Sequence, residues 1–89
     1  MKTYFTKSFK RAYKERIEPN LKLANKFEER YDLFLENPSN RLLSDHPLGK
    51  NLIGFRAFSV TKDIRVVYRV HSNIAYFVDI GTHTKVYKK

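Results

Sequence analysis

Apolar residues recur at helical spacing in the first half of the chain and alternate with polar residues through much of the second half. Near the N-terminus, Phe9, Tyr13 and Ile17 follow one another every four residues, which places them on one face of a helix. Thr6 or Ser8 can cap the start of this helix, because a hydroxyl oxygen accepts a hydrogen bond from a free backbone N–H. The pattern therefore predicts a first amphipathic helix close to the N-terminus.

A second helix is expected after the segment EPN at residues 18–20. Pro19 disfavours helical backbone at the residue before it and suits the first turn of a helix that follows. The segment ENPSN at residues 36–40 ends this second helix. The apolar residues between the two breaks lie at helical spacing, and they are Leu21, Ala24, Phe27, Tyr31, Phe34 and Leu35. We expect a helical hairpin with one apolar side.

Short segments rich in β-branched and aromatic residues predict strands. They are residues 3–5, 55–60, 64–70 and 74–80. The short spacers TKD and HSN between the last three segments predict hairpins. Since two amphipathic helices need an apolar surface to cover, we expect an α+β fold. It would be one domain over residues 1–89, with an N-terminal helical hairpin packed on a twisted antiparallel sheet of about four strands.

The loop between the last two strands sets their register. A three-residue loop at 71–73 would place Asn73 in the left-handed region, which asparagine tolerates. The pairs on one face would then be Val70–Ile74, Tyr68–Tyr76, Val66–Val78 and Ile64–Ile80. This apolar face should pack on the helices. On the opposite face Arg65 would lie across from Asp79, and continued alternation would add Gly81 and His83.

The charge of the chain is strongly positive, with a net value of +9. Residues 1–40 carry nine Lys or Arg against six Asp or Glu, whereas residues 41–89 carry nine against three. Such a surface attracts polyanions, so we expect the second half to contact nucleic acid. The chain has no cysteine, which is typical of the reducing cytoplasm. No apolar run approaches the roughly 20 residues of a membrane span.

Two of the three histidines suit the chemistry of RNA cleavage without a metal. Such a reaction needs a base for the 2′-hydroxyl proton, a cation for the phosphorane and an acid for the leaving 5′-oxygen. His46 and His83 can move protons near neutral pH, and Arg65 can bind a phosphate with its planar fork. His71, in the predicted hairpin loop, is interpreted as exposed and inert.

Each candidate also has an ordinary structural explanation. His83 could bond a backbone carbonyl in a loop, and His46 could shape a turn with its neighbours in SDHPLGKNL. Arg65 could pair with Asp79 across the strands, and Tyr87 could be a core aromatic on the last strand. Three histidines without helical pairing or cysteine partners form a weak ligand set. We therefore expect no metal site and no cofactor.

Two motifs resemble those of the RelE/ParE superfamily of bacterial and archaeal toxins. They are DHPLGKNLIGFRAFSVTKDIRVVYRV and, further on, VDIGTHTKVY. The closest branch is the YafQ type of RelE-like mRNA interferases. The resemblance is strong over residues 45–87 and extends over the helical hairpin as a matching layout. It implies two N-terminal helices on a twisted antiparallel sheet, a cognate antitoxin, and cleavage of mRNA in the ribosomal A site without a metal.

The resemblance also implies roles for particular residues. His46 falls on the histidine of the family's DHPL segment and His83 on that of GTH, both catalytic in the YafQ branch. Asp63 matches an aspartate that affects activity there. Arg65 matches a phosphate-binding arginine of other RelE-like toxins, and Tyr87 occupies the site of a functional C-terminal aromatic residue.

One residue departs from the YafQ pattern. That branch has a second sheet histidine where this chain has Ser59, and a serine cannot act as a base at neutral pH. Catalysis would therefore depend on His46, His83 and Arg65. A two-residue turn after the preceding strand would place Phe58 beside Arg65, and a three-residue turn would place Ser59 there.

Two other functions remain open from the sequence. ParE-like relatives share the fold, lack the catalytic set and bind DNA gyrase. A basic module that binds nucleic acid without cutting it is the third possibility. The expected partners of the ribonuclease are an acidic antitoxin, mRNA and the ribosome. The further basic residues expected to contact RNA are Lys50, Arg56, Lys62, Arg69, Lys85, Lys88 and Lys89.

Overall fold

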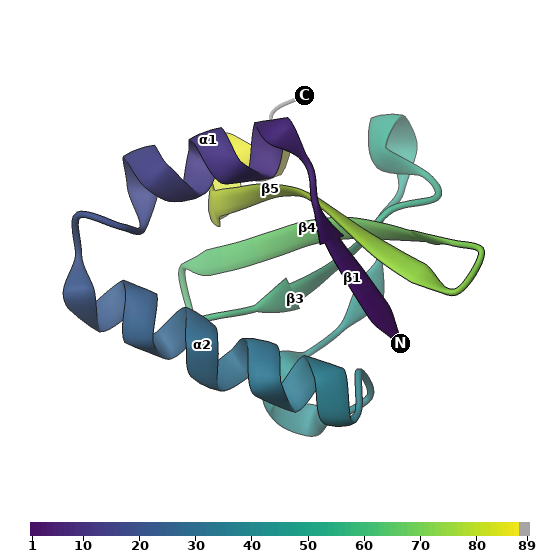
Figure 1. Cartoon of the computed structure of the whole chain (residues 1–89). Helices are drawn as coiled ribbons and strands as arrows, with labels where there is room; N and C mark the ends of the chain where they lie inside the picture. The colour runs from purple at the N-terminus through teal and green to yellow at the C-terminus, as the bar shows by residue number, and fades with distance from the viewer. Residues whose placement is uncertain (88–89) are drawn as a thin grey trace.

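The computed structural model describes residues 1–87. Three helices and five strands make up the fold (Figure 1). The helices are α1 (Lys7–Arg16), α2 (Leu21–Glu36) and α3 (His83–Tyr87). The strands are β1 (Lys2–Phe5), β2 (His46–Pro47), β3 (Arg56–Ser59), β4 (Ile64–His71) and β5 (Ile74–Thr82), and two 3-10 turns are η1 (Arg41–Leu43) and η2 (Lys50–Leu52). None of the described helices is long and apolar enough to cross a bilayer.

The strands form one five-stranded sheet in the order β1-β5-β4-β3-β2. The expected α+β class is confirmed, but the sheet is mixed, since β1 runs parallel to β5 and the other pairs are antiparallel. The prediction of about four antiparallel strands was therefore wrong in both respects. The extra strand β2 has only two residues, one of them Pro47, and carries no alternation that a pattern could reveal.

Side-chain oxygens cap the N-termini of α1 and α2. Thr6 caps α1, and its Oγ1 accepts a hydrogen bond from Phe9 N at 3.2 Å. Ser8, the other candidate, instead donates to Val78 O of β5 at 2.7 Å. Asn20 caps α2, its Oδ1 accepting from Leu23 N. Pro19 therefore precedes the cap, and the expectation that it occupies the first helical turn was wrong.

An aromatic core lies between the helical hairpin and the sheet. Its largest fully buried members are Ile17, Phe34, Leu43, Phe58, Val60, Val66, Tyr68, Phe77 and Ile80. Phe34 stacks on Phe58 with ring centroids 4.9 Å apart. Leu21 and Leu35 are 73% and 41% exposed, so their predicted place on the apolar side of α2 was wrong. The buried face of α2 is therefore narrower than the face predicted from its apolar residues.

The β4–β5 hairpin turns in two residues rather than three. Ser72 and Asn73 both have left-handed backbone, with φ of 50° and 63°, and His71 pairs with Ile74. Tyr68 consequently lies across from Phe77 and not from Tyr76. A bulge after Val67 shifts the register again, so that the remaining pairs are Val67–Asp79, Val66–Ile80, Arg65–Gly81 and Ile64–Thr82. The predicted pairing was wrong along the whole hairpin.

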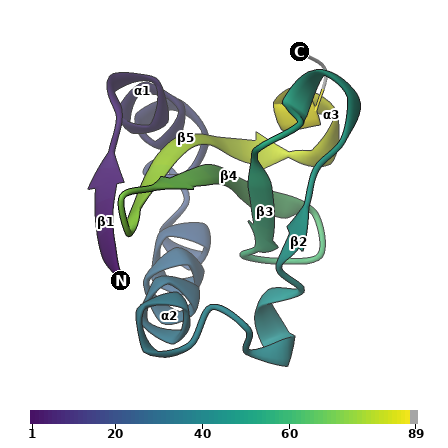
Figure 2. The same cartoon turned by 90° about the vertical axis from the view of Figure 1, so that its right-hand side faces the viewer.

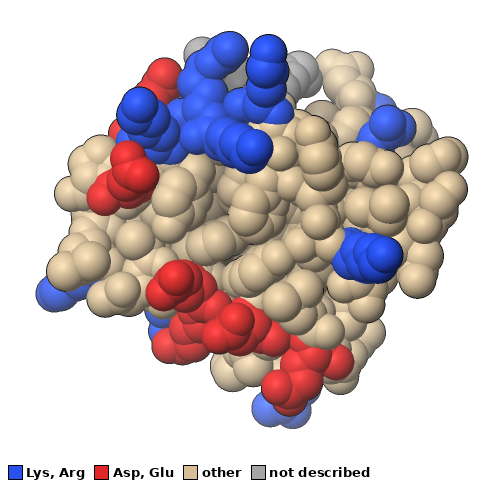
Figure 3. Space-filling model, viewed as in Figure 1, with Lys and Arg blue, Asp and Glu red and all other residues tan. Residues whose placement is uncertain are grey.

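A groove with an aromatic floor separates α1 from α2. Phe5, Phe9, Tyr13, Phe27 and Tyr31 line it, with charged residues at its rims. Figure 3 shows basic side chains gathered over α1 and acidic ones along α2, with uncharged surface between them. Figure 2 shows the helical hairpin on one side of the sheet and α3 on the other.

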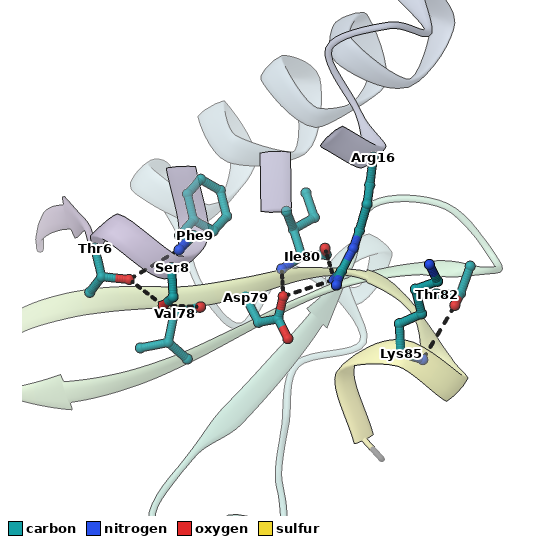
Figure 4. Close-up of polar contacts among 9 residues, drawn as sticks. All are labelled: Thr6, Ser8, Phe9, Arg16, Val78, Asp79, Ile80, Thr82 and Lys85. Atoms are coloured by element: carbon teal, nitrogen blue, oxygen red, sulfur yellow. Dashed lines mark hydrogen bonds and ion pairs between the residues drawn. The ribbon is translucent and has the colours of Figure 1, made fainter. Parts of the chain in front are cut away.

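Arg16 connects α1 to the far half of β5 (Figure 4). Its Nη1 donates to Asp79 Oδ1 at 3.0 Å and to Ile80 O at 2.9 Å. Asp79 is buried, and it pairs with Arg16 rather than with Arg65, the partner expected from the sequence. A Cβ added to Gly81 would come within 2.8 Å of Arg16 Nη1. A side chain at position 81 would therefore require Arg16 to shift.

Candidate active site

The segment GTHTKVY, expected to extend the last strand, ends β5 and forms a short helix. Thr82 is the last residue of the strand, and its Oγ1 accepts a hydrogen bond from Lys85 N at 3.4 Å. His83 and Tyr87 are the first and last residues of α3. Because four residues make about one helical turn, their rings meet edge to face with centroids 4.4 Å apart. His83 is thus presented by a helix, and the strand alternation predicted for it was wrong.

Helix α3 is anchored by a second, small apolar contact. Val86, Val67 and Ala57 are each at most 2% exposed, yet they lie outside the core cluster beneath α1 and α2. On β4, Val67 and Arg65 face away from that cluster, since Ile64, Val66 and Tyr68 belong to it. Helix α3 therefore covers the sheet face on which Arg65 lies.

A hollow of about 380 Å³ lies between α3 and the loop that joins β2 to β3. Its walls are His83 and Tyr87 on one side and residues 48–52 on the other. Figure 2 shows this loop beside α3. Lys50, expected to contact RNA, lines the hollow and has a left-handed φ of 53°. We refer to this feature as the His83 hollow.

Arg65 lies at the edge of the same region. It pairs with Ser59 across β3, and its Nη1 donates to Ser59 Oγ at 2.7 Å. The register left open by the sequence is therefore the one that places Ser59 beside Arg65. Burial raises the pKa of Tyr87, and the nearby charge of Arg65 opposes that rise. Tyr87 OH is buried without a hydrogen-bond partner among the described residues.

His46 lies on β2, the edge strand beside β3. It pairs with Ala57, so it shares a sheet face with Val67 and Arg65. Its ring is exposed, and Nδ1 lies 2.9 Å from Ser44 O. His46 does not line the His83 hollow, and the two histidines are brought to one face but not into contact.

Asp45 fixes the strand that carries His46. Its Oδ1 accepts from Arg56 Nε at 2.7 Å, and its Oδ2 accepts a short hydrogen bond from the Tyr68 hydroxyl. Burial and the bond to Asp45 raise the pKa of Tyr68 above its ordinary value. From the sequence this aspartate was interpreted only as a turn residue, because the pairing with Tyr68 spans 23 positions.

The remaining predicted residues are dispersed. Asp63 is an exposed residue of the β3–β4 turn and does not line the His83 hollow. Lys62 lines a different hollow at that turn. Arg69 and Lys85 are exposed on β4 and α3, whereas Arg56 is engaged by Asp45. The predictions for Lys88 and Lys89 lie outside the described residues. Among residues 1–87, no group of three or more metal-ligating side chains is found.

The fold is a helical hairpin on a mixed sheet, with a histidine and an aromatic residue on a short final helix. A family model described as "Bacterial toxin of type II toxin-antitoxin system, YafQ" matches residues 1–88. The chain therefore belongs to the YafQ family and is a toxin of a type II toxin–antitoxin system. The resemblance to YafQ-type toxins is confirmed.

Solved structures share the fold at low sequence identity. YafQ from E. coli strain BL21(DE3) is 23% identical with a TM-score of 0.81, and the match covers 96% of each chain. The YafQ of the E. coli DinJ–YafQ complex is 23% identical with a TM-score of 0.78 and the same coverage. The YoeB/ParE toxin from Agrobacterium tumefaciens is 21% identical with a TM-score of 0.75, covering 93% of this chain and 99% of its own. No curated protein matches the chain in sequence.

Proposed function

We propose that this toxin is an endoribonuclease that cleaves mRNA, on the ribosome, without a metal ion. The observation that carries the proposal is the arrangement of His83, Tyr87 and Arg65 at one end of the sheet. His83, the proposed proton donor, lines an open hollow, and Arg65, the proposed phosphate-binding cation, is near enough to Tyr87 for its charge to act on that hydroxyl. A gyrase inhibitor has no need of this set.

The reaction uses the nucleophile that RNA itself carries. The 2′-oxygen attacks the adjacent phosphorus, the P–O5′ bond breaks, and the products end in a 2′,3′-cyclic phosphate and a 5′-hydroxyl. His83 in its protonated form donates to the departing 5′-oxygen. Arg65 stabilises the charge that builds on the phosphorane oxygens. Tyr87 supports the His83 ring from its edge.

His46 is the proposed base, and its hydrogen bond fits that role. Ser44 O is a carbonyl oxygen and can only accept, so Nδ1 of His46 must carry the proton in the bond between them. In the neutral ring Nε2 then lacks a proton and can take one from the 2′-hydroxyl. Because His46 and His83 are not in contact, the RNA strand has to lie across the face between them.

Ser59 replaces the second sheet histidine of the YafQ branch without taking over a proton. Its Oγ accepts from Arg65 Nη1, which holds the guanidinium in place. We infer that Ser59 positions Arg65. Asp63 is exposed in the turn between β3 and β4. It would affect the cleavage rate only if the bound RNA reaches this turn.

The cognate partner is proposed to be an acidic antitoxin whose C-terminal segment folds on this chain. Two features support this: the net charge of +9, and the aromatic groove between α1 and α2 with its basic rim over α1. A segment with apolar and acidic residues on one helix face would match both. Expression of the chain alone should arrest growth, and co-expression of the neighbouring gene should restore it. Unimpaired growth at high expression would argue against this partner.

The ribonuclease activity is tested by mapping mRNA 3′ ends after expression in a translating extract. New ends carrying 2′,3′-cyclic phosphates are expected. In an assay without ribosomes, any cleavage should survive EDTA, which would not hold for a metal-dependent nuclease. Intact mRNA together with inhibited DNA gyrase would favour the ParE-like alternative, and RNA binding without new ends would favour a non-catalytic module.

A further inference from the structure

A second hollow lies at the turn between β3 and β4, and its lining contains no residue of α3. It measures about 330 Å³, and three cationic side chains line it, those of Arg30, Lys62 and Arg65. None of the described residues that line it is acidic. A concave surface with charges of one sign concentrates the opposite charge. The second hollow therefore favours an anion.

Arg30 is held in position at the second hollow by a hydrogen bond to the backbone. Its side chain is 14% exposed, and Nη1 donates to Leu42 O at 2.8 Å. Its Nε is buried without a hydrogen-bond acceptor in residues 1–87. The nearest carboxylate, that of Glu29, is 3.7 Å away, beyond hydrogen-bond range, and it also pairs with Lys26 at 3.2 Å. The hydrogen bond to Leu42 O fixes the side chain, so the positive charge of Arg30 stays at the second hollow.

Two hydroxyl groups of the second hollow are also available to donate. Ser59 Oγ accepts from Arg65 Nη1 at 2.7 Å. Thr61 Oγ1 accepts from the backbone N–H groups of Asp63 and Ile64 at 3.2 and 3.1 Å. Because both oxygens already accept, each hydroxyl proton remains for an external acceptor. Fixed guanidinium groups combined with O–H donors suit phosphate oxygens.

We propose that the second hollow binds a phosphodiester group of the same RNA strand, adjacent to the phosphate that is cleaved. Arg65 belongs to both places, since it lines this hollow and its charge reaches Tyr87 at the other. A strand that passes Arg65 would place neighbouring phosphates on its two sides. RNA as the ligand rests on the proposed function. Arg30 and Thr61 are the residues that this site adds to the RNA-binding surface.

The test measures binding of a non-cleavable RNA, a 2′-O-methyl hexanucleotide, to the full chain. One phosphate at a time is replaced by a neutral methylphosphonate. At one position this should weaken binding to the wild type about tenfold, the effect of losing a charge-assisted contact. Lys62→Gln removes only an exposed side chain and should reduce the loss that this methylphosphonate causes, because one of the cations around the phosphate is gone. Arg30→Gln should do the same, while Arg11→Gln, an exposed arginine of α1, should behave as wild type.

The phosphodiester site is ruled out if every methylphosphonate weakens Lys62→Gln as much as wild type. Should Arg30→Gln fail to fold, Lys62→Gln decides alone. A titration with inorganic phosphate tests whether the hollow binds a free ion instead. If Lys62→Gln loses phosphate binding but does not change the effect of any methylphosphonate in the RNA, the assignment to an RNA strand is wrong. Because no strand is cut, these outcomes do not depend on whether the chain is a ribonuclease.

Discussion

The rings of His83 and Tyr87 meet edge to face at 4.4 Å, on successive turns of a helix that has only five residues. So short a helix is not stable by itself. It is held by the buried side chain of Val86 on one face. The candidate acid is therefore positioned by the packing of its helix on the sheet, with the Tyr87 ring against its own ring.

Tyr87 should contribute its ring and not its hydroxyl. The OH is buried without a partner among the described residues, and an unsatisfied buried hydroxyl costs about 1–3 kcal/mol. Tyr87→Phe should therefore leave the free energy of unfolding unchanged or raise it by up to about 1 kcal/mol, with most cleavage retained. Tyr87→Ala should lose both stability and activity. Denaturant unfolding and a cleavage assay measure these effects, and a large loss of rate in Tyr87→Phe would assign the hydroxyl a chemical role.

Gly81→Ala should destabilise the fold by displacing Arg16. The new Cβ would lie 2.8 Å from Arg16 Nη1, so the bonds to Asp79 and Ile80 would have to shift. We expect a loss of about 1–2 kcal/mol in the free energy of unfolding. Gly49→Ala is the matched control, because a Cβ there meets nothing within 4 Å and the backbone is extended.

A double-mutant cycle separates this contact from general strain. In an Arg16→Ala background the obstacle is gone, and the additional cost of Gly81→Ala should be small. An equal cost in both backgrounds would mean that Gly81 is required for another reason.

Tyr68 should make stability depend on pH at the alkaline end. Its pKa is raised in the folded state by burial and by the bond to Asp45, whereas the unfolded phenol ionises at about pH 10. This contribution is fully present below about pH 10 and is lost as pH rises toward the raised folded value. Tyr68→Phe should therefore lower stability at neutral pH, since Asp45 loses a partner, but should show a shallower decline above about pH 10. Urea unfolding at several pH values measures both, and parallel curves would contradict the assignment.

The fold class could be predicted because helices and strands are largely determined by residues that are close in sequence. Helical spacing placed α1 and α2, Thr6 was among the expected caps of α1, and β-branched segments placed β3, β4 and β5. The register of the hairpin did not follow. Ser72 was not expected to adopt a left-handed backbone beside Asn73, and one residue of difference in a turn moves every pair.

The candidate site was predictable in residue type but not in geometry. The chemistry of the side chains and the GTH motif indicated His83, Arg65 and Tyr87. The change from strand to helix at His83, however, depends on the burial of Val86 against the sheet. Asp45 and Arg30 were missed because their partners, Tyr68 and Leu42, are distant in sequence. The residue pattern of one segment cannot predict a contact with a residue that is distant in sequence.

The cleavage rate of His83→Gln tests the proposed ribonuclease mechanism most directly. Glutamine keeps the size and hydrogen bonding of histidine but cannot shuttle a proton. Loss of a general acid costs roughly 10²–10⁴ in rate with little effect on binding. His71→Gln is the control, since His71 is exposed at the far end of β4. We predict that His83→Gln binds RNA as wild type does and cuts it at least about a hundredfold more slowly, while His71→Gln is unaffected. Cleavage by His83→Gln at the wild-type rate would show that His83 only begins a structural helix, and the assignment of His83 as the general acid would be wrong.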